Sequence, residues 1–139
     1  MKLAFIDTSV LLRFLFKEKG AYPLLSKLDR IYASELLQVE TLRGIDRLRI
    51  EHRWQAEEVA LRRGLFTEIC QTISFVPLQK MILQRASEPF ATVVGTMDAI
   101  HIASALLVER EIGAPLFFLT HDKRQGVASK AAGLKTEIC

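Results

Sequence analysis

The sequence predicts an α/β fold in which helices cover both faces of a central parallel sheet of four to five strands. Short apolar or β-branched runs recur along the chain, and stretches with a helical pattern separate them. The two clearest strand candidates, residues 3–6 and 115–120, are continuously apolar apart from Thr120 at the end of the second, which is typical of strands buried on both faces. Strands joined through helices form βαβ units, so these strands should run parallel.

The first half of the chain contains two of the expected strands. The opening strand ends at Asp7 and leads directly into a helix that begins with polar residues. Ser34 can cap the long helix that follows the second strand. The expected elements are a strand at 3–6, a helix at about 8–15, a turn at Gly20 and Pro23, a short helix at 22–28, a strand at 30–33, and helices at 34–51 and 54–70.

The second half continues the alternation. Glu88-Pro89 breaks one helix, Thr96 can cap the next, and Gly133 stops the last. The expected elements are a strand at 72–76, a helix at 78–87, a helix at 96–111, a strand at 115–120, a helix at 123–132 and a short strand at 134–138.

Composition indicates a compact globular protein. The 139 residues, of which 50% are hydrophobic, predict one domain over 1–139 with a helical hairpin at about 34–70. The apolar stretches are too short to span a membrane, and the N-terminus lacks the pattern of a signal peptide. Cys70 and Cys139 fit no metal or redox spacing, so we expect a cytoplasmic protein with reduced thiols. The net charge of +3 permits a polyanionic partner without requiring one.

Four acidic residues are expected at one edge of the sheet. Ligands of parallel sheets bind beyond the carboxyl ends of the strands, where the strand order reverses. Asp7 and Asp122 follow the two clearest strands, and Asp98 lies in the first turn of its helix. Glu40 lies six residues into the helix that begins at Ser34, roughly 9 Å along its axis. These four side chains can therefore share one pocket.

A pocket with four carboxylates favours a divalent cation. The carboxylates repel one another unless a proton or a cation neutralises them, and Mg²⁺ or Mn²⁺ prefers oxygen ligands with retained water. Such ions activate water and stabilise the charge of a phosphoryl transition state, as in many nucleases. Thr8, Ser9 and Thr120 can orient the carboxylates by hydrogen bonding.

Structural roles compete with this interpretation. Each of the three aspartates lies near a helix start, where capping and the helix dipole favour Asp. Arg43 and Arg47 follow Glu40 on one helix face, where they can bind substrate phosphates or form ordinary surface ion pairs. His101 can be a ligand or a base, but a half-buried polar residue beside the sheet is the favoured interpretation. Spacing alone leaves the metal site and the structural roles equally open.

With these four acids in this order, the chain resembles PIN domains, and within that family the VapC-type ribonucleases of toxin–antitoxin systems. The resemblance covers nearly the whole chain, and the four acids occur in the order of the family and at about its spacing. The segments that carry it are 5–11, 34–43, 98–105 and 119–122.

The resemblance implies a three-layer α/β/α sandwich and an endoribonuclease that depends on Mg²⁺ or Mn²⁺. It implies that Asp7 and Asp98 are direct metal ligands, that Glu40 lies near them, and that Asp122 acts through water or is partly structural. Thr8 or Ser9, and Thr120, match the small polar positions beside the acids. It also implies an RNA substrate, a homodimer, and a small cognate antitoxin that the hairpin at 34–70 clasps.

Two other functions stay open from the sequence. The chain can be a PIN-like nuclease of RNA processing outside toxin–antitoxin systems. It can also be a catalytically silent module that binds protein or RNA, in which case Mn²⁺ should not raise its thermal stability.

Overall fold

The computed structural model describes residues 2–16 and 26–138. The expected turn at Gly20 and Pro23, and most of the short helix expected at 22–28, lie outside these residues. The elements along the chain are β1 (Leu3–Ile6), α1 (Thr8–Leu15), β2 (Arg30–Ser34), α3 (Leu36–Glu51), α4 (Ala56–Cys70), β3 (Ile73–Val76), α5 (Lys80–Ser87), α6 (Thr96–Ile112), β4 (Phe117–Thr120), α7 (Lys123–Ala131) and β5 (Lys135–Ile138).

The strands form a five-stranded sheet with the order β3-β2-β1-β4-β5, and every neighbouring pair is parallel. This confirms the predicted fold class at the upper end of the expected strand count. Strand β1 lies in the centre, with β2 on one side and β4 on the other. The strand order therefore reverses between β1 and β4, where a parallel sheet places its ligand site.

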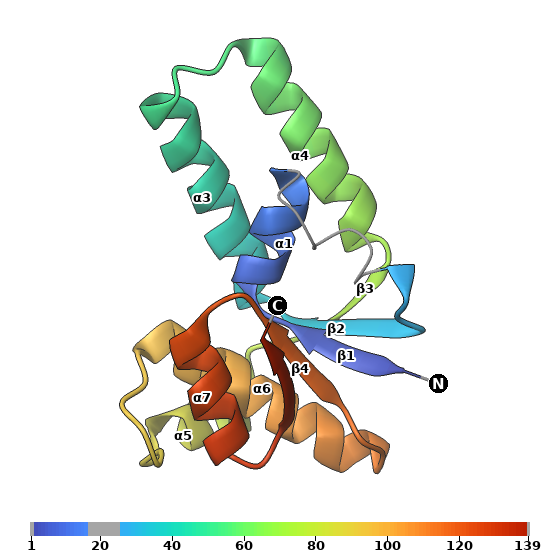
Figure 1. Ribbon diagram of the computed structural model, residues 1–139, viewed down its shortest axis with the longest axis vertical. Coiled ribbons are helices and arrows are strands. Elements are labelled where there is room, and N and C mark those ends of the chain that lie inside the picture. The colour runs from blue at the N-terminus through green and yellow to red at the C-terminus, as the bar shows by residue number, and fades with distance from the viewer. Residues whose placement is uncertain (1, 17–25, 139) are drawn as a thin grey trace.

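Helices cover both faces of the sheet and make three layers (Figure 1). Because side chains alternate along a strand, Leu3 and Phe5 of β1 face one layer, and Ala4 and Ile6 face the other. Apolar residues of α1, α3 and α4 pack with Ala4 and Ile6. Figure 1 shows α3 and α4 as a hairpin that projects beyond the sheet, with α1 beside it.

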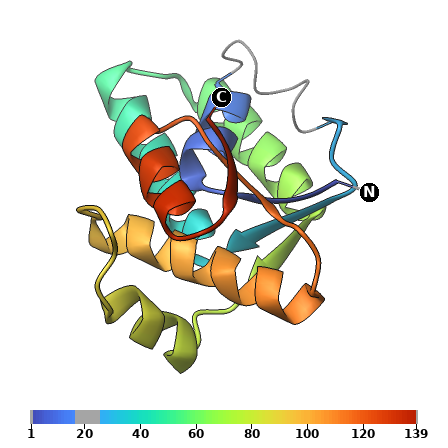
Figure 2. The ribbon, with the colours of Figure 1, turned by 60° about the horizontal axis from the view of Figure 1, so that its bottom comes forward.

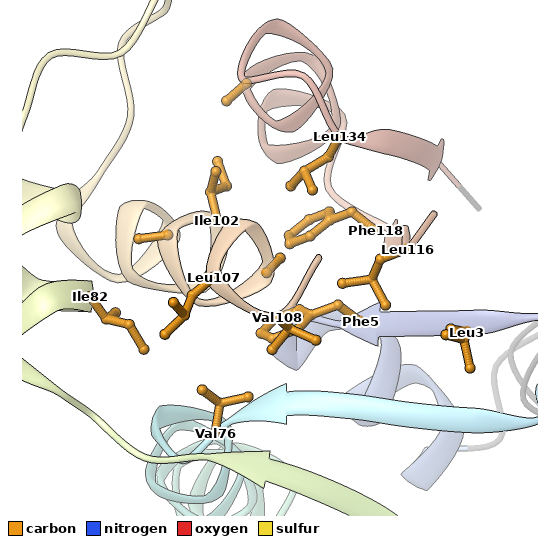
Figure 3. Close-up of a cluster of buried hydrophobic side chains, with 13 residues drawn as sticks. Leu3, Phe5, Val76, Ile82, Ile102, Leu107, Val108, Leu116, Phe118 and Leu134 are labelled. Carbon is orange, nitrogen blue, oxygen red and sulfur yellow. The ribbon is translucent and has the colours of Figure 1, made fainter. Parts of the chain in front are cut away.

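The other layer contains α5, α6 and α7. Helix α6 lies on the sheet, and α5 packs against α6 (Figure 2). Phe5 and Phe118 are fully buried in the core of this layer, with their rings stacked at a centroid distance of 5.8 Å. Figure 3 shows these two rings among aliphatic side chains from the sheet and helices, such as Ile102 of α6. This packing fixes β1 and β4 side by side.

Two helix starts differ from the expected ones. Ser34 is the last residue of β2, and Glu35 is the N-cap of α3, although the Ser34 hydroxyl still accepts a hydrogen bond from the Leu36 backbone N–H at 3.1 Å. Thr96, which was expected to cap α6, is instead its first helical residue, and Gly95 is the N-cap. At the other end, Gly133 follows the last turn of α7 with φ of 100°, a backbone conformation that glycine adopts without strain.

None of the helices in the described part of the chain has the length and apolar character needed to cross a membrane.

Candidate active site at the carboxyl ends of β1 and β4

Asp7 lies between β1 and α1 with only 5% of its surface exposed. Its Oδ1 accepts hydrogen bonds from the Ser9 backbone N–H at 3.1 Å and from the Ser9 hydroxyl at 2.5 Å. Asp7 is thus itself the N-cap of α1. The capping role that competed with metal binding is therefore present at Asp7, because the backbone leaves β1 in an extended conformation and directs this carboxylate to the N–H of Ser9, the second residue of the helix.

The second oxygen of Asp7 is held from β4. The Thr120 hydroxyl donates to Asp7 Oδ2 at 2.5 Å, and it accepts the Asp122 backbone N–H at 3.0 Å. The His121 backbone N–H donates to the Ser9 hydroxyl at 2.9 Å. Hydroxyls of Ser9 and Thr120 therefore tie the end of β1 to the turn after β4, and fix the orientation of the Asp7 carboxylate.

Burial raises the pKa of Asp7 above its ordinary value, although hydrogen bonds from Ser9 and Thr120 and the charge of His101 act in the opposite direction. The charged form of this carboxylate is thus disfavoured in the folded protein. A cation placed beside it would favour the charged form again.

Glu40 reaches the site from α3. Its Oε1 accepts a hydrogen bond from the Thr8 hydroxyl at 2.7 Å and lies 2.5 Å from Nε2 of His101. Burial raises the pKa of Glu40, but the hydrogen bond and charge of His101, together with the Thr8 hydroxyl, outweigh burial and lower it overall. Glu40 is therefore ionised at neutral pH.

Asp98 lies in the first turn of α6 and is partly buried. Its pKa is raised by burial first and then by the negative charge of Asp122. The charge of His101 acts in the opposite direction, and Asp7 and Glu40 raise the pKa by smaller amounts. The other three carboxylates are therefore close enough to Asp98 for their charges to act on it. Within the described part of the chain, the Asp98 carboxylate makes no hydrogen bond, so it does not cap α6, although its place in the first turn suits the helix dipole.

Asp122 is an exposed helix cap. Its Oδ1 accepts the backbone N–H groups of Arg124 at 2.8 Å and Gln125 at 3.3 Å, at the start of α7. Asp122 thus has the structural role expected for it, as the N-cap of α7. Its charge still raises the pKa of Asp98, so it also belongs to the acidic cluster.

The site brings together the seven side chains expected there from four distant segments. They are the acids Asp7, Glu40, Asp98 and Asp122 and the hydroxyl residues Thr8, Ser9 and Thr120. Across the residues that the structure describes, no three His, Cys, Asp or Glu side chains are grouped tightly enough to hold an ion by themselves. A donor set of carboxylate oxygens nevertheless fits Mg²⁺, which typically takes one or two carboxylates and keeps several waters.

Arg43 and Arg47 make ion pairs on their own helix. Arg43 lies 3.1 Å from Asp46, and Arg47 lies 3.8 Å from Glu51. Both arginine side chains are mostly exposed, as ordinary surface ion pairs are. Contact of either arginine with a substrate phosphate stays a prediction.

His101 is more deeply buried than the sequence indicated. It is 1% exposed rather than half-buried, and it contacts Glu40 directly. The signal in the sequence was its place one helical turn after Asp98 in an otherwise apolar stretch. Its contact with α3 depends on the tertiary fold, which the spacing could not predict.

Comparisons with known proteins identify the family and the fold of the chain. The family model of the PIN domain matches residues 4–131. The fold is similar to a chain in the crystal structure of VapBC2 from Rickettsia felis bound to a DNA fragment from their promoter, with a TM-score of 0.69, 12% identity and 98% of each chain covered. It is also similar to a chain of a toxin–antitoxin complex from Klebsiella pneumoniae, with a TM-score of 0.63, 17% identity and 88% of each chain covered. No curated protein matches the sequence significantly.

Proposed function

Because the chain belongs to the PIN-domain family, whose members are nucleases, we propose that it is a divalent-metal-dependent endoribonuclease and the toxin of a toxin–antitoxin pair. Its reaction is then the hydrolysis of phosphodiester bonds in RNA. The observation that carries this proposal is the acidic cluster of Asp7, Glu40, Asp98 and Asp122 at the point where the strand order reverses.

The proposed metal ligands are Asp7 and Asp98, with Glu40 beside them and Asp122 acting through water. A bound Mg²⁺ or Mn²⁺ supplies Lewis-acid stabilisation of phosphate charge and lowers the pKa of water. Asp7 suits a ligand role because Ser9 and Thr120 hold its two oxygens in a fixed orientation. Asp98 suits it because its carboxylate is held near three other negative charges that a cation would neutralise.

Other residues of the chain would also take part in the proposed reaction. Glu40 is kept ionised by His101 and Thr8, so it can accept a proton or orient water near the phosphate. Arg43 and Arg47 lie on the same helix as Glu40 and are exposed enough to contact flanking phosphates once their surface ion pairs open.

The toxin assignment is supported by the similar solved structures, which are described as VapBC2 and as a toxin–antitoxin complex. The hairpin of α3 and α4 is the surface we propose for a small antitoxin, because it exposes apolar side chains of which Val39 is 59%, Ile50 63% and Leu61 50% exposed. A cytoplasmic homodimer is the proposed form of the toxin.

The test is cleavage of a structured RNA by the purified chain with Mg²⁺ and with EDTA. Fragments are expected with Mg²⁺ and absent with EDTA, because the cluster needs a cation to become active. Equal cleavage in both conditions would contradict metal dependence. No cleavage with Mg²⁺ or Mn²⁺, and no rise of Tm with Mn²⁺, would favour the silent binding module.

A further inference from the structure

His101 joins the two helical layers of the fold at the acidic cluster. It lies on α6, which covers one face of the sheet, and its Nε2 is 2.5 Å from Oε1 of Glu40 on α3, which covers the other face. Its side chain is 2% exposed, whereas that of Glu40 is 27% exposed. The contact is therefore anchored in the interior at the histidine end and opens toward solvent at the carboxylate end.

Two donors converge on one oxygen of Glu40. An ionised carboxylate can only accept hydrogen bonds, so Nε2 is the donor in this contact. The Thr8 hydroxyl donates to the same Oε1 at 2.7 Å and lies 3.5 Å from Nε2. Among the described residues, the other oxygen of Glu40 has no hydrogen-bond partner. The arrangement anchors one oxygen and leaves the other available to a ligand.

The same contact sets the position of Glu40 relative to Asp98. Asp98 and His101 lie three residues apart on α6, so they occupy neighbouring positions on one face of this rigid helix. A histidine that bonds to Glu40 thereby fixes the separation of Glu40 from Asp98. The pKa of Glu40 agrees with a strong contact, since it is lowered in spite of burial, which is the largest effect on it.

A purely structural histidine explains these observations less well. The buried Nδ1 of His101 has no hydrogen-bond partner within the described part of the chain, and an unpaired buried polar atom destabilises a fold. An apolar residue at this place in the core would avoid that cost. What an apolar residue could not provide is the hydrogen bond from Nε2 to Glu40.

We propose that His101 is a positioning residue of the nuclease site, which holds the Glu40 carboxylate with one oxygen directed to the metal and substrate. This inference rests on the proposed function, because it assigns His101 a role in that same site.

The test compares His101→Leu, which removes the donor, with His101→Gln, whose amide nitrogen can take the place of Nε2. Mn²⁺ affinity is measured by titration, and kcat and KM for RNA cleavage are measured separately. His101→Leu is expected to weaken Mn²⁺ binding or to lower kcat by about 10- to 100-fold, which is the usual effect of losing a residue that orients a metal ligand. KM should change little. His101→Gln should stay near the wild type. A glutamine variant as defective as the leucine variant would overturn the proposal.

A double-mutant cycle with Glu40→Gln separates positioning from general packing. If His101 acts through Glu40, adding His101→Leu to Glu40→Gln should cause little further loss. If His101→Leu lowers Mn²⁺ affinity or kcat by the same factor in the wild type and in Glu40→Gln, the proposal is overturned. If His101→Leu does not fold, His101→Asn replaces it, because its shorter amide keeps the polarity and loses the reach to Glu40.

Two outcomes distinguish this inference from the proposed function. If the wild type binds Mn²⁺ and cleaves RNA while His101→Leu behaves identically, the positioning role is refuted and the nuclease stands. If the wild type neither binds Mn²⁺ nor cleaves RNA, the proposed function fails, and the role of His101 fails with it.

Discussion

Asp7→Asn is expected to lower Mg²⁺-dependent RNA cleavage by at least about 100-fold, the scale seen when one preorganised electrostatic group is removed from an active site. Asparagine has the same size, and its oxygen can still accept the hydrogen bonds from Ser9. Its amide nitrogen takes the place of Oδ2, so the Thr120 hydroxyl has to accept a hydrogen bond there instead of donating one. The change therefore removes the negative charge at nearly constant volume. The decrease is measured as the ratio of the initial cleavage rates of the wild type and the variant on one RNA at saturating Mg²⁺.

The matched control is Asp29→Asn. Asp29 is exposed at the amino end of β2, on the opposite edge of the sheet, and its Oδ2 accepts the Lys2 backbone N–H. The chemical change is the same, but it lies outside the acidic cluster, so cleavage should not change. Undiminished activity of Asp7→Asn would refute the assignment of the site.

The same Asp7→Asn variant should be more stable than the wild type at neutral pH without metal. The pKa of Asp7 is raised on folding by burial, so the folded state favours the protonated carboxyl. The stability that Asp7 contributes is therefore complete at a pH below its pKa in the unfolded chain. This stability is lost as the pH rises through the pKa of Asp7 in the folded protein. Neutral asparagine does not incur this loss. Thermal unfolding in EDTA should show a higher Tm for the variant at pH 7 and a smaller difference near the ordinary pKa of 3.8. An equal or lower Tm at pH 7 would contradict the proposed desolvation of Asp7.

Phe118→Ala is expected to destabilise the fold by about 3–5 kcal/mol, the usual cost of removing a buried aromatic ring. Phe118 is fully buried and stacks on Phe5, so the change leaves a cavity between β4 and the central strand. Thr120, which orients Asp7, lies two residues further along β4. A loss of this size is a large part of the total stability of about 5–15 kcal/mol for a typical domain. Urea unfolding followed by circular dichroism measures it.

Val93→Ala is the control for the core substitution. Val93 is 89% exposed, so its truncation should change the free energy of unfolding by no more than about 0.5 kcal/mol. Similar urea midpoints for the Phe118 and Val93 variants would show that the stacked pair does not stabilise the sheet as described.

The architecture was largely predictable because it depends on patterns that are local in the sequence. The continuously apolar run of β1 predicts a strand buried on both faces, and the alternation of strands and helices predicts a parallel sheet. The order of the strands does not follow from these patterns, since it depends on how the helices pack. The cap of α6 was misplaced by one residue, because Thr96 is a good capping residue but the extended backbone of Gly95 places the cap there. At α3 the Ser34 hydroxyl does accept the Leu36 backbone N–H, and the helical backbone of Glu35 makes the start of this helix differ by only one residue.

The acidic cluster was predictable for a different reason. Once the strands are parallel, Asp7 and Asp122 must lie at the same edge, and the N-terminus of α6 carries Asp98 there. The contact of His101 with Glu40 joins residues 61 positions apart on helices from opposite faces of the sheet. No local pattern in the sequence encodes that contact, so the histidine was expected to be only half-buried.

We expect the acidic cluster of Asp7, Glu40, Asp98 and Asp122 to bind a divalent cation. This expectation is tested most directly by titrating Mn²⁺ into the wild type and into Asp98→Asn, with free Mn²⁺ followed by electron paramagnetic resonance. Asp98 suits this test because its carboxylate makes no hydrogen bond within the described residues, so its replacement disturbs little else. Saturable binding by the wild type that is lost or strongly weakened in Asp98→Asn is the predicted result. Identical binding curves for the two proteins, or no binding by the wild type, would contradict it.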